Sequence, residues 1–188
     1  MRKCLTGVLI ASALAAGGCA GPRTTQEIWP LYRPGEFARA AGGRDMYVVL
    51  RGSPFAMDTA QFEHLVLSNM QGQNWGQRTN FTTKPVNYDP GYKVVLLFNG
   101  PPVNGGDLCR NPGAIPFRTG PQPELHIQAA HCRFDQWQTT VQGWLKGDAN
   151  GVDPQALAGL IRQVTAELFP PYNSNDARRD SNRLRITP

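Results

Sequence analysis

Apolar residues between positions 46 and 171 follow two different spacings, one typical of strands and one typical of helices. Runs rich in β-branched and aromatic residues, bounded by Gly, Pro, Asn and Asp, predict strands. The run YKVVLLFN at 92–99 holds five consecutive apolar residues, which indicates a strand buried on both faces and central in a sheet. The predicted strands are residues 46–51, 78–83, 92–99, 125–134 and 138–147.

Two helices are predicted from apolar residues that recur three and four positions apart. Asp58 is the expected N-cap of the first helix, and Gly72 ends it. Asp153 and Pro154 begin the second helix, which ends at the Phe-Pro-Pro of 169–171 because proline cannot extend the hydrogen-bond ladder.

Each predicted helix has a single apolar stripe, so both are expected to cover the same side of one sheet. The predicted fold class is α+β, a two-layer sandwich in which an about five-stranded mixed sheet carries two helices packed on one face. Residues 46–172 are the predicted extent of this domain, and the other face of the sheet is expected to be relatively open.

The last two predicted strands allow two registers. Leu125 and Ile127 share a face with Leu145 only if the connecting loop has an odd length or the hairpin contains a bulge. A simple two-residue turn would instead place Trp144 with Ile127. Trp144 is therefore either a core residue or an exposed one.

The N-terminus has the pattern of an export signal. Positive residues at 2 and 3 precede an apolar run at 5–16, which is too short to span a membrane. The small residues directly before Cys19 resemble the lipobox of bacterial lipoproteins, which implies a signal peptide at 1–18 and lipid on Cys19. Ala20 resembles the sorting signal for the outer membrane of Gram-negative cells. Plain secretion after an Ala-x-Ala cut is the alternative.

Two segments flank the predicted domain. Residues 19–45 contain several prolines and glycines and little periodicity, which is typical of a tether, and about 25 residues of coil reach on the order of 28 Å. Residues 173–188 contain four Arg and two Asp with almost nothing to bury, so they are predicted to form a disordered basic tail.

Charge and cysteine usage narrow the function classes. Loss of the signal leaves 17 basic against 14 acidic residues, and no basic helix or zinc module accompanies this small excess, so nucleic-acid binding is not expected. With Cys4 removed and Cys19 lipidated, Cys109 and Cys132 remain, and an oxidising compartment favours a disulfide between them. A metal pair or a reactive thiol is the competing interpretation.

The chain offers no convergent catalytic pattern. His126 and His131 lie five residues apart on a predicted strand and therefore point to opposite faces. Ser53 lacks the Gly-x-Ser-x-Gly elbow of a nucleophilic hydrolase. We therefore expect a protein without enzymatic activity, cofactor or metal; a hydrolase would need two of His126, His131, Asp107 and Glu124 to converge.

The long segment 100–124 is the candidate binding loop. Structureless loops of this length are uncommon in compact domains and often bind ligands. A Cys109–Cys132 bond would fix this loop across the open side of the sheet, with Arg110, Phe117 and Arg118 as its candidate contacts. A loop that merely caps apolar surface is the alternative.

The lipobox together with the strands YKVVLLFN and QTTVQGWLKG and the helix LIRQVTAELFPPY resembles uncharacterised proteobacterial lipoproteins. The arrangement is also similar to the N-terminal domain of the Tol-system protein TolB and to lipoprotein activators of penicillin-binding proteins. The resemblance implies a module for protein contacts in the cell envelope. The expected protein is an outer-membrane lipoprotein that faces the periplasm and binds another envelope component; a small-ligand carrier with an enclosed cavity is the second hypothesis.

Overall fold

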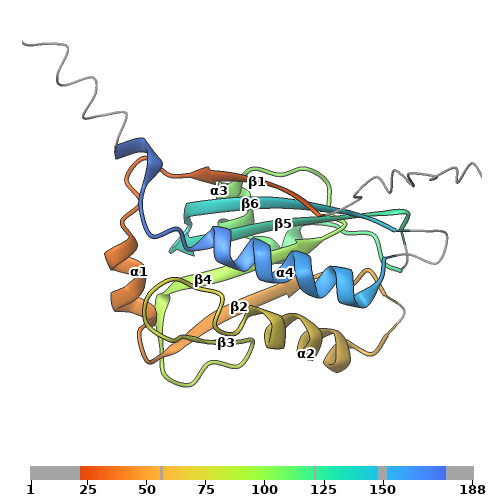
Figure 1. The fold of residues 1–188 in the computed structure, drawn as a ribbon, viewed down its shortest axis with the longest axis horizontal. Helices are drawn as coiled ribbons and strands as arrows, with labels where there is room; N and C mark the ends of the chain where they lie inside the picture. The colour runs from red at the N-terminus through yellow and green to blue at the C-terminus, as the bar shows by residue number, and fades with distance from the viewer. Residues whose placement is uncertain (1–21, 56, 121, 148–151, 177–188) are drawn as a thin grey trace, which may run out of the picture.

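The computed structural model describes residues 22–55, 57–120, 122–147 and 152–176. A twisted sheet runs through the molecule, with helices on both of its faces and at one end (Figure 1). The elements are, in chain order, β1 (Arg23–Ile28), α1 (Pro34–Ala41), β2 (Asp45–Arg51), α2 (Thr59–Met70), β3 (Asn80–Thr82), β4 (Tyr88–Phe98), α3 (Gly105–Arg110), the 3-10 turn η1 (Pro112–Ala114), β5 (Glu124–Arg133), β6 (Gln136–Lys146) and α4 (Pro154–Leu168).

The sheet has six strands in the order β1-β6-β5-β4-β2-β3. β2 pairs in parallel with β3 and β4, whereas the pairs β4–β5, β5–β6 and β6–β1 are antiparallel. The apolar run at 94–98 lies in β4 and is fully buried, so the predicted central strand is confirmed. The predicted α+β class with a mixed sheet is also confirmed, although the sheet gains β1 and the helices gain α1 and α3.

α2 and α4 lie side by side on one face of the sheet (Figure 1). The Asp58 carboxylate caps α2 by accepting from two backbone amides, and Asp153 caps α4 in the same way through the amide of Ala156. Burial of one apolar stripe per helix against β4, β5 and β6 forms the larger core. Both predicted helices are therefore present where the capping residues and the apolar stripes place them.

The opposite face is covered rather than open, so that part of the prediction is wrong. α3 and the loop after it place Leu108, Cys109 and Ile115 against Val95 and Leu97 of β4, in a second apolar cluster. The face needs this cover because β4 is apolar on both sides, and each apolar side chain left in water would cost about 1.5–3 kcal/mol.

The prediction of a tether over 19–45 is also wrong for the described part of that segment. β1 pairs with β6 from Arg23 opposite Trp144 to Ile28 opposite Thr139. Pro34 occupies the first turn of α1, where its missing amide costs nothing, and Phe37 of the same helix is buried in the core. The domain therefore begins at Arg23 instead of at 46.

The C-terminal boundary also moves. Asn173 is buried, and its Nδ2 lies 3.1 Å from each of three backbone oxygens between β1 and α1. The domain therefore extends through Asp176, and the predicted boundary at 172 is too early. The signal at 1–18, Cys19 and the remaining basic tail at 177–188 lie outside the described residues.

The register of β5 and β6 follows the bulge alternative. An irregularity between His131 and Cys132 lets Leu125 pair with Leu145 on the core face. Trp144 pairs with His126 and points to the other face, where it is half-buried. A Cβ at Gly143 would stand 2.9 Å from the side chain of Leu160, so a glycine there lets α4 pack closely on β6.

Candidate functional site: the disulfide-fixed loop

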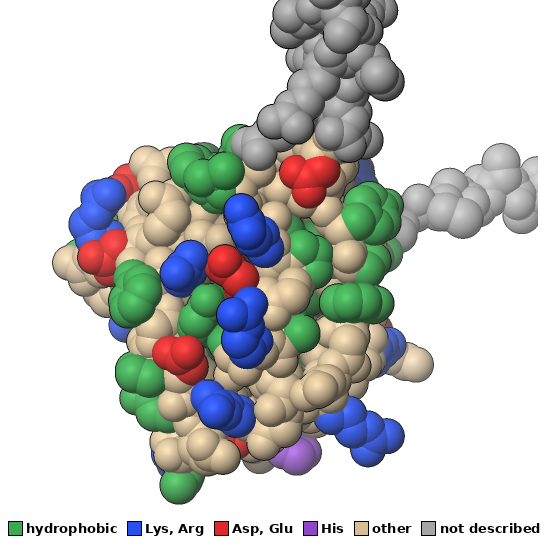
Figure 2. All heavy atoms as spheres, turned by 90° about the vertical axis from the view of Figure 1, so that its left-hand side faces the viewer, with side chains coloured by type: hydrophobic (Ala, Val, Ile, Leu, Met, Phe, Trp, Pro, Cys, Tyr) green, Lys and Arg blue, Asp and Glu red, His purple; other side chains and the backbone are tan. Residues whose placement is uncertain are grey.

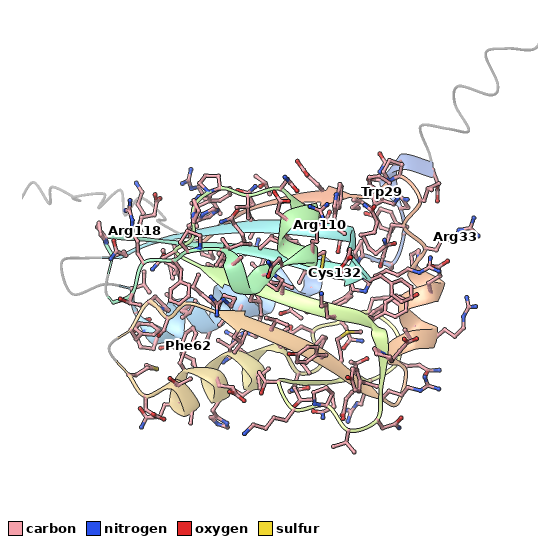
Figure 3. The ribbon with its side chains drawn as sticks, turned by 180° about the vertical axis from the view of Figure 1, so that it is seen from behind. Trp29, Arg33, Phe62, Arg110, Arg118 and Cys132 are labelled. Atoms are coloured by element: carbon pink, nitrogen blue, oxygen red, sulfur yellow. A yellow bond between two sulfur atoms is a disulfide. The ribbon has the colours of Figure 1, made fainter. Side chains whose placement is uncertain are left out.

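The loop between β4 and β5 is bonded to the sheet. Cys109 of α3 and Cys132 of β5 form a disulfide, and both residues are fully buried in the second apolar cluster (Figure 3). The predicted pairing is confirmed, including the position of Cys132 on the face opposite Leu125. The bond fixes α3 across this face of the sheet.

Polar contacts close the loop at its two ends. Asn99 lies in the left-handed region with φ 53°. Its backbone N–H donates to the backbone oxygen of His126 at 2.8 Å, and its backbone oxygen accepts from the backbone N–H of Arg118 at 3.0 Å. Its Oδ1 accepts the His126 amide at 3.2 Å. Buried Gln128 accepts the Val103 amide at 2.9 Å and donates to the Pro101 oxygen at 2.7 Å. The loop therefore has a fixed path rather than a free one.

The three candidate contact residues do not gather at one place. Arg110 is exposed at the end of α3 and forms an ion pair with Asp107 at 3.2 Å. Phe117 lies under the guanidinium of Arg51, 5.1 Å from the ring centroid. Arg118 lies at the end of the sheet far from α1 (Figure 3). The structure brings Phe117 and Arg118 to a common cleft and places Arg110 apart from them.

This loop cleft has a volume of about 480 Å³. Prolines and Phe117 form its apolar wall, and amide, imidazole, carboxylate and guanidinium groups supply its polar lining. The lining residues are Asn99, Gly100, Pro101, Pro102, Pro116, Phe117, Arg118, Gln122, Glu124 and His126.

Two nitrogens in the cleft are chemically distinctive. Asn99 lines the cleft, and its Nδ2 is buried without a hydrogen-bond acceptor among the described residues. Desolvation lowers the pKa of His126, and this effect outweighs the hydrogen bond with Gln142 and the charge of Glu124, both of which raise it. The imidazole is therefore neutral near pH 7, and with Nε2 hydrogen-bonded to Gln142 Oε1 at 3.3 Å, Nδ1 is the ring nitrogen left for another partner.

A short charged cluster borders the cleft beside the start of β1. Arg23 forms an ion pair with Glu124 at 3.4 Å, and its guanidinium lies 5.7 Å from the ring centroid of Trp144. Both side chains of the ion pair are exposed, so the pair contributes little to the stability of the fold. Its main effect is to hold the Arg23 and Glu124 side chains in place beside the cleft.

A hydrolase would need two of His126, His131, Asp107 and Glu124 to converge, and no hydrogen bond joins any two of them in the described chain. His126 and Glu124 border the same cleft, but no hydrogen bond joins them. Asp107 accepts from Asn104 at 2.7 Å and pairs with Arg110. His131 lies on the opposite face, buried among aromatic rings.

The described residues contain no group of three His, Cys, Asp or Glu side chains that could hold a metal ion. In the same ranges no helix is both long and apolar enough to cross a membrane.

The α1 end of the molecule has a second hollow, of about 350 Å³. It mixes basic and acidic side chains, and hydrophobic side chains surround them (Figure 2). Its Arg133 is already paired with Glu36 at 3.2 Å, so part of its charge is satisfied within the protein. The loop cleft, which combines an apolar wall with an unpartnered amide nitrogen in its lining residue Asn99, is the stronger candidate for a ligand.

Sequence reasoning missed three residues of this region: Asn99, Arg51 and Trp144. Arg51 is the last residue of β2 and Asn99 directly follows β4, positions from which side chains often reach a site, but spacing along the chain gives no indication that they meet the loop. The stack of Trp144 on His126 could not be predicted, because the sequence allowed two registers for the last two strands.

No known protein family matches the chain, and no curated protein matches it. Among solved structures it is similar to a PelC variant from Paraburkholderia phytofirmans, solved as a dodecamer, with 11% sequence identity and a TM-score of 0.45. The match covers 80% of this chain and 99% of PelC. A similarity this low assigns neither a family nor a function.

Proposed function

We propose that the protein is a non-enzymatic lipoprotein of the outer membrane, anchored through Cys19, whose loop cleft binds another component of the cell envelope. A protein of an assembly, secretion or peptidoglycan-synthesis machine fits this role. The observation that carries the proposal is the loop itself: a buried disulfide and the Asn99 backbone contacts fix its path, and the cleft beside it is lined by Asn99, whose buried Nδ2 has no acceptor among the described residues.

The disulfide supports an extracytoplasmic location. Structural disulfides persist in oxidising compartments such as the periplasm and are rare in the cytosol. Cys109 and Cys132 are fully buried in an apolar cluster, so this bond is part of the core. The bond therefore agrees with export by the signal at 1–18.

The position of β1 would set how the anchored domain meets the membrane. Arg23 follows Cys19 by four residues, and four extended residues span at most about 14 Å. The cleft borders this same end, since Arg23 pairs with Glu124. An anchored protein would thus hold the loop cleft close to the lipid headgroups, and its partner would be met at the membrane surface.

Crosslinking in cells tests this proposal. A photoreactive amino acid at position 118, on the rim of the cleft, is expected to form an adduct with an envelope protein. The matched control is position 86, since Val86 is 91% exposed and lies beside Asp45, away from the cleft. An adduct found equally from both positions, or from neither, would contradict a binding role for the cleft.

A Cys19→Ala variant separates anchoring from binding. This variant is expected to leave the membrane fraction and to lose the position-118 adduct, because the partner is met at the membrane surface. Retention of the variant in the membrane would contradict lipid anchoring. Loss from the membrane with the adduct preserved would contradict the membrane-surface location while leaving the cleft as the binding site.

A further inference from the structure

One edge of the sheet is only partly covered. β3 pairs with β2 over Asp45–Tyr47 alone, whereas β4 pairs with β2 through Arg51 on the other side. Residues 48–51 of β2 therefore have a strand on one side and none on the other within the described chain (Figure 1). Their outward backbone N–H and C=O groups are available to another strand.

A groove of about 490 Å³ runs along this bare edge. α2 forms one wall with Phe62 and Glu63, and the disulfide-fixed loop forms the other with Phe117 and Thr119. Val48 and Leu50 belong to the helix side of the sheet and Val49 to the loop side, as strand alternation requires. The groove thus presents apolar side chains on both sides of an unpaired backbone.

Arg51 gives the groove a charged end. Its Nη2 donates to the Gly113 oxygen at 2.9 Å, and its guanidinium lies over the Phe117 ring. Its Nε is buried without an acceptor among the described residues. A buried donor of a charged group that lacks an acceptor is costly, and a carboxylate oxygen in the groove would satisfy it.

At the other end of the groove, Glu63 accepts a hydrogen bond from Thr83, just beyond β3. The groove is therefore acidic where β3 ends and basic where β2 ends. A bound segment would match it with a basic residue near Glu63 and an acidic residue near Arg51.

We propose that this edge binds an extended segment of a partner polypeptide, which adds to β2 as a strand in line with β3 and places a carboxylate on Arg51. Unpaired backbone groups select a peptide backbone, and the apolar and charged walls select its side chains. This chain's own residues 177–188 fit poorly, because their four Arg would meet Arg51. The groove along this edge is distinct from the loop cleft, although the side chain of Phe117 borders both.

A peptide of the sequence Lys-Thr-Val-Thr-Val-Asp is the probe, added to the mature chain carrying Cys19→Ala. Hydrogen exchange measured by NMR is expected to slow at least tenfold at outward-facing amides of residues 48–51 when the peptide saturates the protein. A peptide with N-methyl groups at alternate positions is expected not to bind, since it cannot complete the ladder.

Arg51→Gln is expected to weaken peptide binding about tenfold, and Arg51→Lys less. Arg33→Gln is the matched control, because Arg33 is exposed at the other end of the molecule (Figure 3). Thermal melts verify that each variant is folded, and replacing the peptide's Asp by Asn in the wild-type protein tests the same contact without changing the fold.

Three results would overturn the proposal. The first is no protection of residues 48–51 at millimolar peptide, and the second is equal binding of the N-methylated peptide. The third is protection already present in the free protein, which would assign the edge to a second copy if sedimentation shows a dimer, or to residues 177–188 if their deletion removes it.

Discussion

His126 and Trp144 lie directly opposite each other on β5 and β6, with their rings stacked 5.1 Å apart and inclined by 13°. Arg23 of β1 lies over the same indole. The stack therefore joins the first strand of the domain to the lining of the loop cleft.

Trp144→Ala is expected to raise the pKa of His126 towards its ordinary value, because removing the indole admits water to an imidazole whose pKa is lowered by desolvation. It should also destabilise the fold by about 1–2 kcal/mol, since the aromatic pair and part of its buried area are lost. NMR titration and urea unfolding measure both effects. Trp75→Ala, at a residue that is 49% exposed, is the control and should leave the His126 titration unchanged.

His131 is expected to make the protein sensitive to acid. It is fully buried among aromatic rings, neither ring nitrogen has a partner in the described residues, and burial lowers its pKa to about 3. Between pH 6.5 and pH 3 the unfolded chain binds a proton that the folded protein does not. The contribution of neutral His131 to the free energy of unfolding is therefore fully present above pH 6.5. It is lost as the pH falls towards 3, by on the order of several kcal/mol in total.

His131→Phe removes this proton and is expected to flatten the dependence of the unfolding free energy on pH across that window. The exposed His64→Gln serves as the control, and its profile should follow the wild type. A His131→Phe profile as steep as the wild type would assign the acid sensitivity to other groups.

Loss of the Cys109–Cys132 bond is expected to destabilise the protein by about 3 kcal/mol, because the bond closes a loop whose ends are 23 positions apart. The double variant Cys109→Ala, Cys132→Ala should show this difference in denaturant unfolding under non-reducing conditions. Amides of α3 should then exchange faster, while those of α2 remain protected. Equal protection of α3 in both proteins would mean that the packing alone fixes the loop.

Asn99→Ala is expected to be less stable than Asn99→Gly by about 1 kcal/mol, although both remove the side chain. The reason is the positive φ of 53° at this residue, which glycine adopts freely and alanine does not. Because both variants lack the Asn99 side chain, the difference between their thermal unfolding measures the cost of the positive φ at this position. A more stable alanine variant would show that the turn relaxes.

The sequence predicted those elements whose residues carry a strong signal. β4 is a continuous apolar run, and α2 and α4 have capping aspartates and single apolar stripes, so all three are present as predicted. β1 was missed because it is an edge strand of mostly exposed polar residues, RTTQEI. α1 and α3 are short and rich in Gly or Pro, so their local signals resemble those of coil.

The candidate site was predicted less completely. Phe117 and Arg118 border the cleft because the disulfide fixes the loop, and the cysteine count supported that bond. Arg110 points elsewhere because its nearest partner is Asp107 in its own helix. Asn99 and Arg51 meet the loop only through the fold, since strand pairing brings distant residues together.

The mass of the intact protein purified from its native host is the most direct test of the lipoprotein account. That account predicts a chain that begins at Cys19 and is heavier than its sequence by a diacylglycerol group and a further acyl chain. An unmodified chain that begins at any other residue would contradict it.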